Sequence, residues 1–491
     1  MGTRYNILGL LRSPSSVYVI FRYGTYIVQF LNSILLAKAL GDIKYGIYSF
    51  VFLIMQYMSY SNLGINESLN TEYAVSKDSD RCKIWNTSWA LNLLINTFLF
   101  MVFAFLISIV SLFSRYEFDS YGMLLLMTCI VINLSRIYIT YYKLHGKLIK
   151  LNIQQFLPHF VLLVLVLIMW NKLTVRQIVV SYLMSNVIAL IIFRVDLPNP
   201  PSFQIDRSIA SVLLRRGITL LLYNLSFYLL TLVASSLVSS YFSLEEFGCY
   251  SFVNTLIHGI IMACGAFLFI FYPKILNRLY SCDEDKAYEL ISRIRGVYIL
   301  FIDLVSLLSI FVAVVLSYLL PQYRNDITII FPILILGQII MSSTTGHSAY
   351  LLSKKKEFRL VVFGFESVVL TLVLGILCGE YINSLYALSL VVPISSLFYT
   401  FMTTRESLAT MNKSHAIADV LKEIFALKKW FPCVLVLIYA FVINQWHVIL
   451  IGVGIYLFIN YKNLLFINYK NLRISIKEGV RIISDRNSLL V

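Results

Sequence analysis

The chain is dominated by apolar stretches of about twenty residues, separated by charged residues or by proline and glycine. A helix rises 1.5 Å per residue, so about twenty apolar residues cross the ~30 Å hydrocarbon core of a bilayer. The alternating pattern of a membrane β-strand is absent, and backbone groups in lipid must bond within their own segment, which favours helices. Apolar residues form 59% of the chain and charged residues 13%, a balance that a water-soluble protein could not keep away from solvent. The sequence therefore predicts an all-α integral membrane protein of about fourteen transmembrane helices.

The predicted spans follow from apolar windows between charged or proline- and glycine-marked breaks. They are 16–40, 46–66, 88–113, 121–142, 155–171, 176–194, 217–241, 248–272, 297–320, 327–352, 360–379, 382–403, 430–445 and 447–461.

The basic residues between the spans set the orientation. With the N-terminus inside, thirty-two Lys and Arg residues fall on inside connections and six on outside ones. This is the asymmetry expected of cytoplasmic loops, and it accounts for the net charge of +15 without a nucleic-acid partner. The N-terminus lacks a signal-peptide cleavage pattern. We therefore predict a multi-pass protein of the bacterial inner membrane with both termini in the cytoplasm.

Loop lengths suggest how the chain is organised. Every outside connection is short, whereas several inside ones are longer, and the connection at 404–429 is amphipathic enough to lie along the membrane surface. The predicted organisation is a six-helix lobe at 1–195, a cytoplasmic linker at 196–216, a second six-helix lobe at 217–403, the amphipathic connection at 404–429, two helices at 430–461 and a basic tail at 462–491.

An internal repeat supports the two lobes. The stretch LGDIKYGIYSF at 40–50 returns as FSLEEFGCYSF at 242–252, an offset of 202 residues. Both copies join an odd-numbered span to the next on the outside face. Six spans lie between them, and six is even, so the halves have the same topology and are related by an axis along the membrane normal. The alternative is a chance match of common residues.

These motifs resemble the multidrug/oligosaccharidyl-lipid/polysaccharide (MOP) superfamily, and within it the Wzx O-antigen flippases. The resemblance rests on the two turns above, on NLGINESL at 62–69, on FYPKI at 271–275 and on the layout of fourteen spans as six, six and two. It implies a V-shaped transporter whose two lobes enclose a central cavity. The implied cargo is an undecaprenyl-pyrophosphate-linked oligosaccharide, moved from the cytoplasmic to the periplasmic leaflet. The implied partners are this lipid-linked oligosaccharide and membrane lipids, with a polysaccharide polymerase and a chain-length regulator as further candidates, and we expect a monomer.

Four ionisable residues lie inside predicted spans, where a charge costs roughly 2.5–3.5 kcal/mol at the bilayer centre on insertion scales. Arg22 and Arg136 come from the first lobe, and Asp303 and Glu366 come from the second. All four lie about six residues from the cytoplasmic end of a span. We predict that the two arginines attract the substrate pyrophosphate, because a guanidinium group can donate two parallel hydrogen bonds to phosphate oxygens. The two acids would carry a coupling proton or Na⁺, or would gate the cavity by pairing with the arginines. The alternative, which the sequence leaves open, is that these side chains reach out to head groups or form static pairs.

Polar residues in the later predicted spans are further candidates for a functional role. His258 lies near the middle of the predicted eighth span and is a candidate for coupling or gating, with a hydrogen-bonded packing role as the alternative. The run SSTTG at 342–346, followed by His347, indicates a loosened helix in the tenth span. Seven cysteines show no paired motif, so we predict no metal site, no catalytic residue and no cofactor.

The sequence leaves three alternative functions besides an oligosaccharide flippase. An ion-coupled multidrug or small-solute exporter and a lipid II flippase share the expected fold. A membrane polysaccharide polymerase is disfavoured, because such enzymes use a long extracytoplasmic loop and this chain has none. No phosphate-binding loop is present, so this chain does not bind ATP through one.

Overall fold

The computed structural model describes residues 14–109, 114–145, 147–170, 172–195, 197, 200–425 and 454. Within these residues every regular element is helical. The described helices form two compact units that divide between Leu225 and Ser226.

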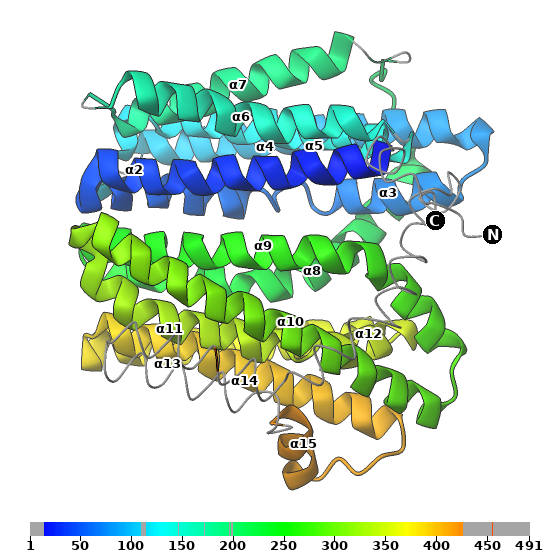
Figure 1. The fold of residues 1–491 in the computed structure, drawn as a ribbon. Coiled ribbons are helices and arrows are strands. Elements are labelled where there is room, and N and C mark those ends of the chain that lie inside the picture. The colour runs from blue at the N-terminus through cyan, green and yellow to red at the C-terminus, as the bar shows by residue number, and fades with distance from the viewer. Residues whose placement is uncertain are drawn as a thin grey trace, which may run out of the picture. The chain divides into compact units, whose positions relative to one another are not determined.

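The first unit is built from long helices that run alternately in opposite directions (Figure 1). In chain order it holds α2 (Pro14–Met58), α3 (Ile65–Val75), α4 (Asp78–Ile109), the short turns η1 (Ser114–Tyr116) and η2 (Phe118–Ser120), α5 (Gly122–Leu144), α6 (Leu148–Ile168), α7 (Val175–Val195) and the first part of α8 (Arg207–Tyr241). Here α2 packs on α6, α6 packs on α7, and α5 packs on both α4 and α7.

The second unit repeats this arrangement of packed helices. It holds the rest of α8, then α9 (Leu244–Ser281), α10 (Glu284–Leu319), η3 (Pro321–Tyr323), α11 (Arg324–Ser342), α12 (Thr345–Ser353), α13 (Glu357–Leu377), the π-helical turn η4 (Cys378–Ile382), α14 (Leu385–Thr410) and α15 (Ile417–Ile424). In this unit α11 packs on α14, α10 and α9, while α13 packs on α14.

The helices have the length and composition of membrane spans. Eight helices in the described part of the chain are long and apolar enough to cross a membrane, and the broken helix α8 is a ninth candidate. The first twelve predicted spans all fall on described helices. The last two, 430–445 and 447–461, lie outside the described residues, so the count of fourteen stays a prediction.

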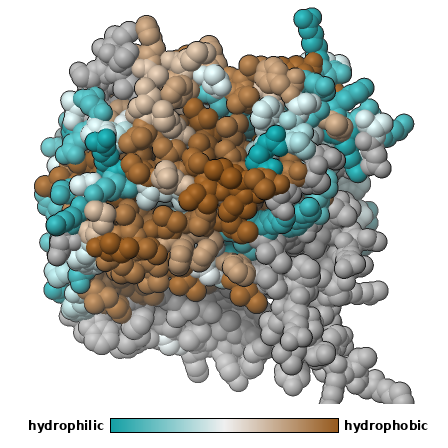
Figure 2. All heavy atoms as spheres, turned by 90° about the horizontal axis from the view of Figure 1, so that it is seen from above, coloured by the Kyte–Doolittle hydropathy of each residue, from teal (hydrophilic) through white to brown (hydrophobic). Residues whose placement is uncertain are grey.

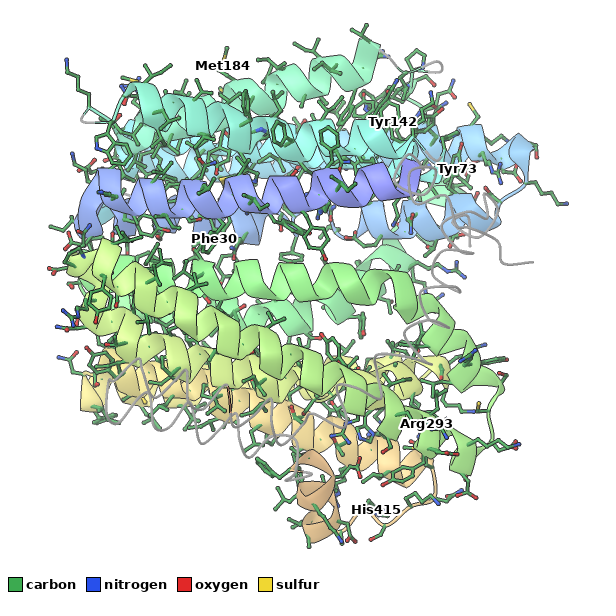
Figure 3. The ribbon with its side chains drawn as sticks, viewed as in Figure 1. Phe30, Tyr73, Tyr142, Met184, Arg293 and His415 are labelled. Carbon is green, nitrogen blue, oxygen red and sulfur yellow. The ribbon has the colours of Figure 1, made fainter. Side chains whose placement is uncertain are left out.

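The exterior of the first unit is apolar over its middle. Figure 2 shows a band of hydrophobic side chains on one face, with hydrophilic residues toward both ends. Helices α6 and α7 present Leu167, Ile168, Met184 and Ile191, each more than half exposed, and Met184 points away from the neighbouring helices (Figure 3). A band of this kind fits the surface that a membrane helix bundle presents to lipid.

The second predicted span is not one continuous helix. Gly41 has φ +71° and separates the first two spans within α2, which then ends at Met58, well before the predicted end at residue 66. Residues 59–64 form turns, with Leu63 and Gly64 at positive φ, and α3 begins at Ile65. The predicted single helix over 46–66 is therefore wrong at its inner end, because this segment contains a break.

The internal repeat is a repeat of packing as well as of sequence. Phe50 and Phe252, which end the two copies, are both buried. The Phe50 ring stacks on Tyr116 with centroids 3.8 Å apart, and the Phe252 ring lies 4.9 Å from that of Tyr323. Tyr116 ends η1 and Tyr323 ends η3, so in each unit this phenylalanine is held by the short turn that precedes α5 or α11.

Candidate functional site

A chain of buried asparagines crosses the first unit. Asn66, Asn92, Asn96 and Asn133, from α3, α4 and α5, are all at least nine-tenths buried. Asn92 donates to Asn66 Oδ1 at 3.3 Å, Asn96 donates to the side chain of Asn92, and Asn133 donates to Asn96 Oδ1 at 3.0 Å. Polar side chains within an apolar bundle are costly unless they bond to one another, so this network fixes the relative positions of three helices.

The network ends at the break in the second span. Asn133 Nδ2 donates to the backbone carbonyl of Met58 at 3.0 Å and to Ser61 Oγ at 2.9 Å. A helix that ends at Met58 leaves its last carbonyl groups without helical partners. The asparagine adds a donor to the Met58 carbonyl, which also accepts from the backbone N–H of Ser61 at 3.2 Å and from Ser61 Oγ at 2.7 Å, so the network is joined to the turn that ends the helix.

Arg136 lies one turn after Asn133 on α5 and supplies a second donor to the same break. Its Nη1 donates to the carbonyl oxygen of Ser59 at 2.7 Å, and the side chain is half-buried. The structure thus gives this predicted substrate-binding residue a backbone contact that the sequence did not indicate. The contact orients the guanidinium group at the break.

Arg22, the other predicted cation, lies near the start of α2 and is half-buried. Its Nε donates to Tyr26 Oη at 2.8 Å, and the guanidinium lies 5.1 Å from the centre of the Tyr26 ring. A cation over an aromatic face is stabilised by the ring quadrupole. In the described part of the chain Arg22 forms no ion pair with a carboxylate, so its charge is not neutralised there by an acid of the protein.

The predicted acids and the histidine belong to the second unit. Glu366 is exposed on α13, on the same helix face as Val369 and Val373, and has no hydrogen-bond or ion-pair partner among the described residues. His258 is half-buried on α9. Asp303 lies within α10, but its side chain is outside the described residues. Each of these three roles stays a prediction.

The sequence analysis missed the asparagines. Asn92 and Asn96 lie four residues apart within the predicted third span, a spacing that places them on one helix face, and Asn133 lies within the predicted fourth span. Uncharged amides within apolar spans are the signal that points to them, and it is weaker than that of a charged residue in the same place.

No group of three or more His, Cys, Asp or Glu residues in the described part of the chain could hold a metal ion.

Comparisons with known proteins give a family and a fold. The family model of polysaccharide biosynthesis proteins matches residues 12–275, more than half of the 491 residues. No curated protein sequence matches the chain.

Solved structures with this fold are transporters. A structure of the lipid II flippase MurJ in an inward closed conformation matches with a TM-score of 0.70 and 12% identity, over 91% of this chain and 99% of that one. An inward-facing multidrug-resistance MATE transporter of the MOP superfamily matches with a TM-score of 0.61 and 13% identity, over 82% of this chain and 99% of that one. The predicted all-α membrane fold, of the kind seen in these transporter structures, is confirmed.

Proposed function

The chain belongs to the polysaccharide biosynthesis protein family, and from this premise we propose that it is a flippase for an undecaprenyl-pyrophosphate-linked oligosaccharide. It would move an O-antigen-type repeat unit from the cytoplasmic to the periplasmic leaflet of the inner membrane. Membership of this family is the observation that carries the proposal, because it ties a transporter fold to the assembly of polysaccharide. The structural likeness to a protein described as a lipid II flippase supports it, since that protein also handles a lipid-linked substrate.

Arg22 and Arg136 are the residues we propose for the pyrophosphate. A half-buried guanidinium without a carboxylate partner in the described residues suits an anionic cargo, and this describes Arg22. The bond to Ser59 orients the Arg136 side chain beside the break in the second span, where it could bind the anion. Two such groups can share the oxygens of a pyrophosphate through charge-assisted hydrogen bonds.

Glu366, Asp303 and His258 are the residues we propose for coupling or gating. Glu366 supports this best, because an exposed carboxyl on an apolar helix face is costly to keep charged in a membrane. Binding of a proton or Na⁺ would lower that cost, which links the occupancy of the site to an ion gradient.

The test compares a strain lacking this gene with strains that carry variants of it. We expect lipid-linked repeat units to accumulate on the cytoplasmic leaflet of the deletion strain, and the intact gene to relieve this. Arg22→Glu should fail to relieve it, whereas Arg207→Glu, an exposed position at the start of α8, should succeed. An Arg22→Glu, Arg136→Glu double variant that restores full transport would overturn the cationic site.

A second candidate is an ion-coupled multidrug or small-solute exporter, favoured by the likeness to the MATE transporter. In that case the deletion strain would make normal surface polysaccharide and would instead become more sensitive to cationic dyes. Accumulation of lipid II, with normal repeat units, would point to the third candidate, a lipid II flippase.

A further inference from the structure

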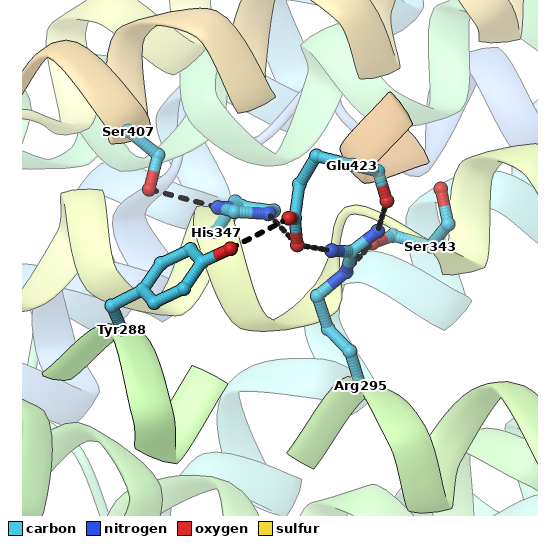
Figure 4. Close-up of polar contacts among 6 residues, drawn as sticks. All are labelled: Tyr288, Arg295, Ser343, His347, Ser407 and Glu423. Atoms are coloured by element: carbon cyan, nitrogen blue, oxygen red, sulfur yellow. Dashed lines mark hydrogen bonds and ion pairs between the residues drawn. The ribbon is translucent and has the colours of Figure 1, made fainter. Parts of the chain in front are cut away.

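A buried arginine joins three elements of the second unit. Arg295 lies on α10 and is only 5% exposed. Its Nε donates to the backbone carbonyl of Ser343 at 3.0 Å, its Nη1 bonds to the carboxylate of Glu423, and its Nη2 donates to the backbone carbonyl of Glu423 at 3.0 Å (Figure 4). Each nitrogen of this one side chain is therefore engaged, two of them with α15 and one with the end of α11.

Glu423 collects contacts from further helices. Tyr288 of α10 donates to Glu423 Oε2 at 2.9 Å. His347 Nε2 of α12 lies 3.8 Å from Glu423 Oε1, while His347 Nδ1 lies 3.0 Å from the hydroxyl oxygen of Ser407 on α14. Burial disfavours the charged carboxyl, yet the neighbouring His347 and the charge of Arg295 outweigh it and hold the pKa of Glu423 at about 2. We call these residues the Glu423 junction.

Apolar packing holds α15 in the same place. Val420 and Ile424 are fully buried and belong to a cluster with Leu279, Ala287, Ile291, Ala349 and Leu408. Ile417 and Leu421 lie on the other face of α15 and are exposed. The short helix is therefore docked along one face only. The Glu423 junction fixes its C-terminal end, where Arg295 contacts Glu423.

Gly346 permits the close approach that the junction requires. A Cβ at this position would lie 2.8 Å from Ile291 Cγ2 and 3.0 Å from Arg295 Cγ. Gly346 lies in the first turn of α12, directly after the turn at Ser343 and Thr344 that separates α11 from α12. Ser343 and Thr344 keep φ and ψ in the right-handed helical region, so the SSTTG run is a local turn within one apolar stretch, Pro321–Ser353, and α10 packs against it.

The first unit shows a similar contact without the acid. There Arg136 donates to the carbonyl of Ser59 at the break in the second span, as Arg295 donates to the carbonyl of Ser343 at the turn between α11 and α12. In both units an arginine of a packed helix donates to a carbonyl at a turn between two helices, although α5 and α10, which supply the arginines, hold different positions in the two units. In the second unit this arginine is also tied to a surface helix, so the turn is linked to α15.

We propose that Glu423 and Arg295 are positioning residues through which α15 controls the geometry of the turn between α11 and α12. While α15 is docked, Arg295 is neutralised and aimed at Ser343, and the α11–α12 turn is held in one arrangement. When α15 leaves, Arg295 loses its carboxylate and the turn loses its fixed partner. The inference concerns conformation and does not depend on which cargo is carried.

The experiment measures amide hydrogen exchange, peptide by peptide, in the purified full chain. In Glu423→Gln we expect faster exchange in α15 and, at least tenfold, in peptides covering residues 339–348. Lys422→Gln is the matched control, since it removes a charge from the adjacent exposed position; it should change neither region.

A milder variant keeps the test decisive if Glu423→Gln folds poorly. Tyr288→Phe removes one hydrogen bond to Glu423 and leaves the ion pair intact, so we expect a smaller increase in the same two regions. An increase confined to α15, with residues 339–348 exchanging as in the parent, would overturn the proposed connection. An Arg295→Lys variant should also loosen 339–348, because a lysine cannot bond to Ser343 and to both groups of Glu423 at once.

Discussion

A close contact between two glycines of the first unit gives a sharp prediction. Gly64, at the break in the second span, faces Gly217 of α8, and a Cβ on Gly64 would lie 1.9 Å from the Gly217 carbonyl oxygen. Ordinary contact begins near 3.4 Å, so the two backbones would have to separate by about 1.5 Å. Both obstacles are backbone atoms, and no side-chain rotation can relieve the clash.

The expected cost of Gly64→Ala combines two effects. Overpacking of a tight contact costs about 1–3 kcal/mol, and a left-handed backbone conformation, here φ +73°, costs an alanine about 1 kcal/mol more. We expect a loss of about 3 kcal/mol, which would lower the unfolding midpoint by on the order of 10 °C in a unit of this size. Gly217→Ala meets the same contact at 2.8 Å without the positive φ, so it should cost less.

The assay is the thermal midpoint of the purified protein in detergent, with the double variant included. Both changes open the same contact, so the double variant should lose less than the sum of the two single ones. Gly24→Ala is the control, because a Cβ added at this position of α2 would have no atom within 4 Å. The thermal midpoint of this variant should stay at or above that of the parent. A Gly64→Ala midpoint equal to the parent's, or strict additivity with Gly217→Ala, would refute the close contact.

Three further outcomes are expected. Asn133→Ala removes donors to Met58 and Ser61 and should cost about 2–4 kcal/mol, read from thermal unfolding; a cost below that of an exposed substitution would contradict the network. Phe50→Ala and Phe252→Ala each remove a buried ring from equivalent places, so each should cost about 3–5 kcal/mol, and a large inequality would argue against equivalent packing. The carboxyl of Glu423 has a lowered pKa, so it stabilises the docked α15 above the ordinary value of 4.5, and this contribution is lost as pH falls toward 2. The protection factors of α15 amides, in which the intrinsic pH dependence of exchange is removed, should fall with pH over this range in the parent and change less in Glu423→Gln, and equal profiles would exclude this role.

The length and order of the helices could be predicted from the sequence, because an apolar stretch in lipid must satisfy its backbone hydrogen bonds within itself, which a helix does. The repeat at residues 40–50 and 242–252 also predicted two units of the same topology. The break at 59–64 could not be read in the same way. NLGIN contains Asn and Gly, which are common at helix ends, but they stand within a long apolar window, and the positive φ at Leu63 and Gly64 shows that the helix stops there.

The candidate site was predicted less completely. Charged residues stood out, so Arg22 and Arg136 were found, but the bond from Arg136 to Ser59 depends on a break that the pattern does not show. The Glu423 junction joins residues more than a hundred positions apart in sequence. Each partner alone reads as an ordinary loop charge, and only the fold brings them together.

The central claim, that this chain moves a lipid-linked oligosaccharide across a bilayer, is tested most directly in vesicles of purified protein and labelled substrate. A membrane-impermeant enzyme that cleaves the exposed sugar reaches only the outer-leaflet share when no flippase is present. With the intact protein we expect the enzyme to consume the inner-leaflet share as well, and Arg22→Glu vesicles to behave like empty ones. An inner-leaflet share that stays protected with folded, intact protein, under an imposed H⁺ or Na⁺ gradient of either direction, would contradict the account.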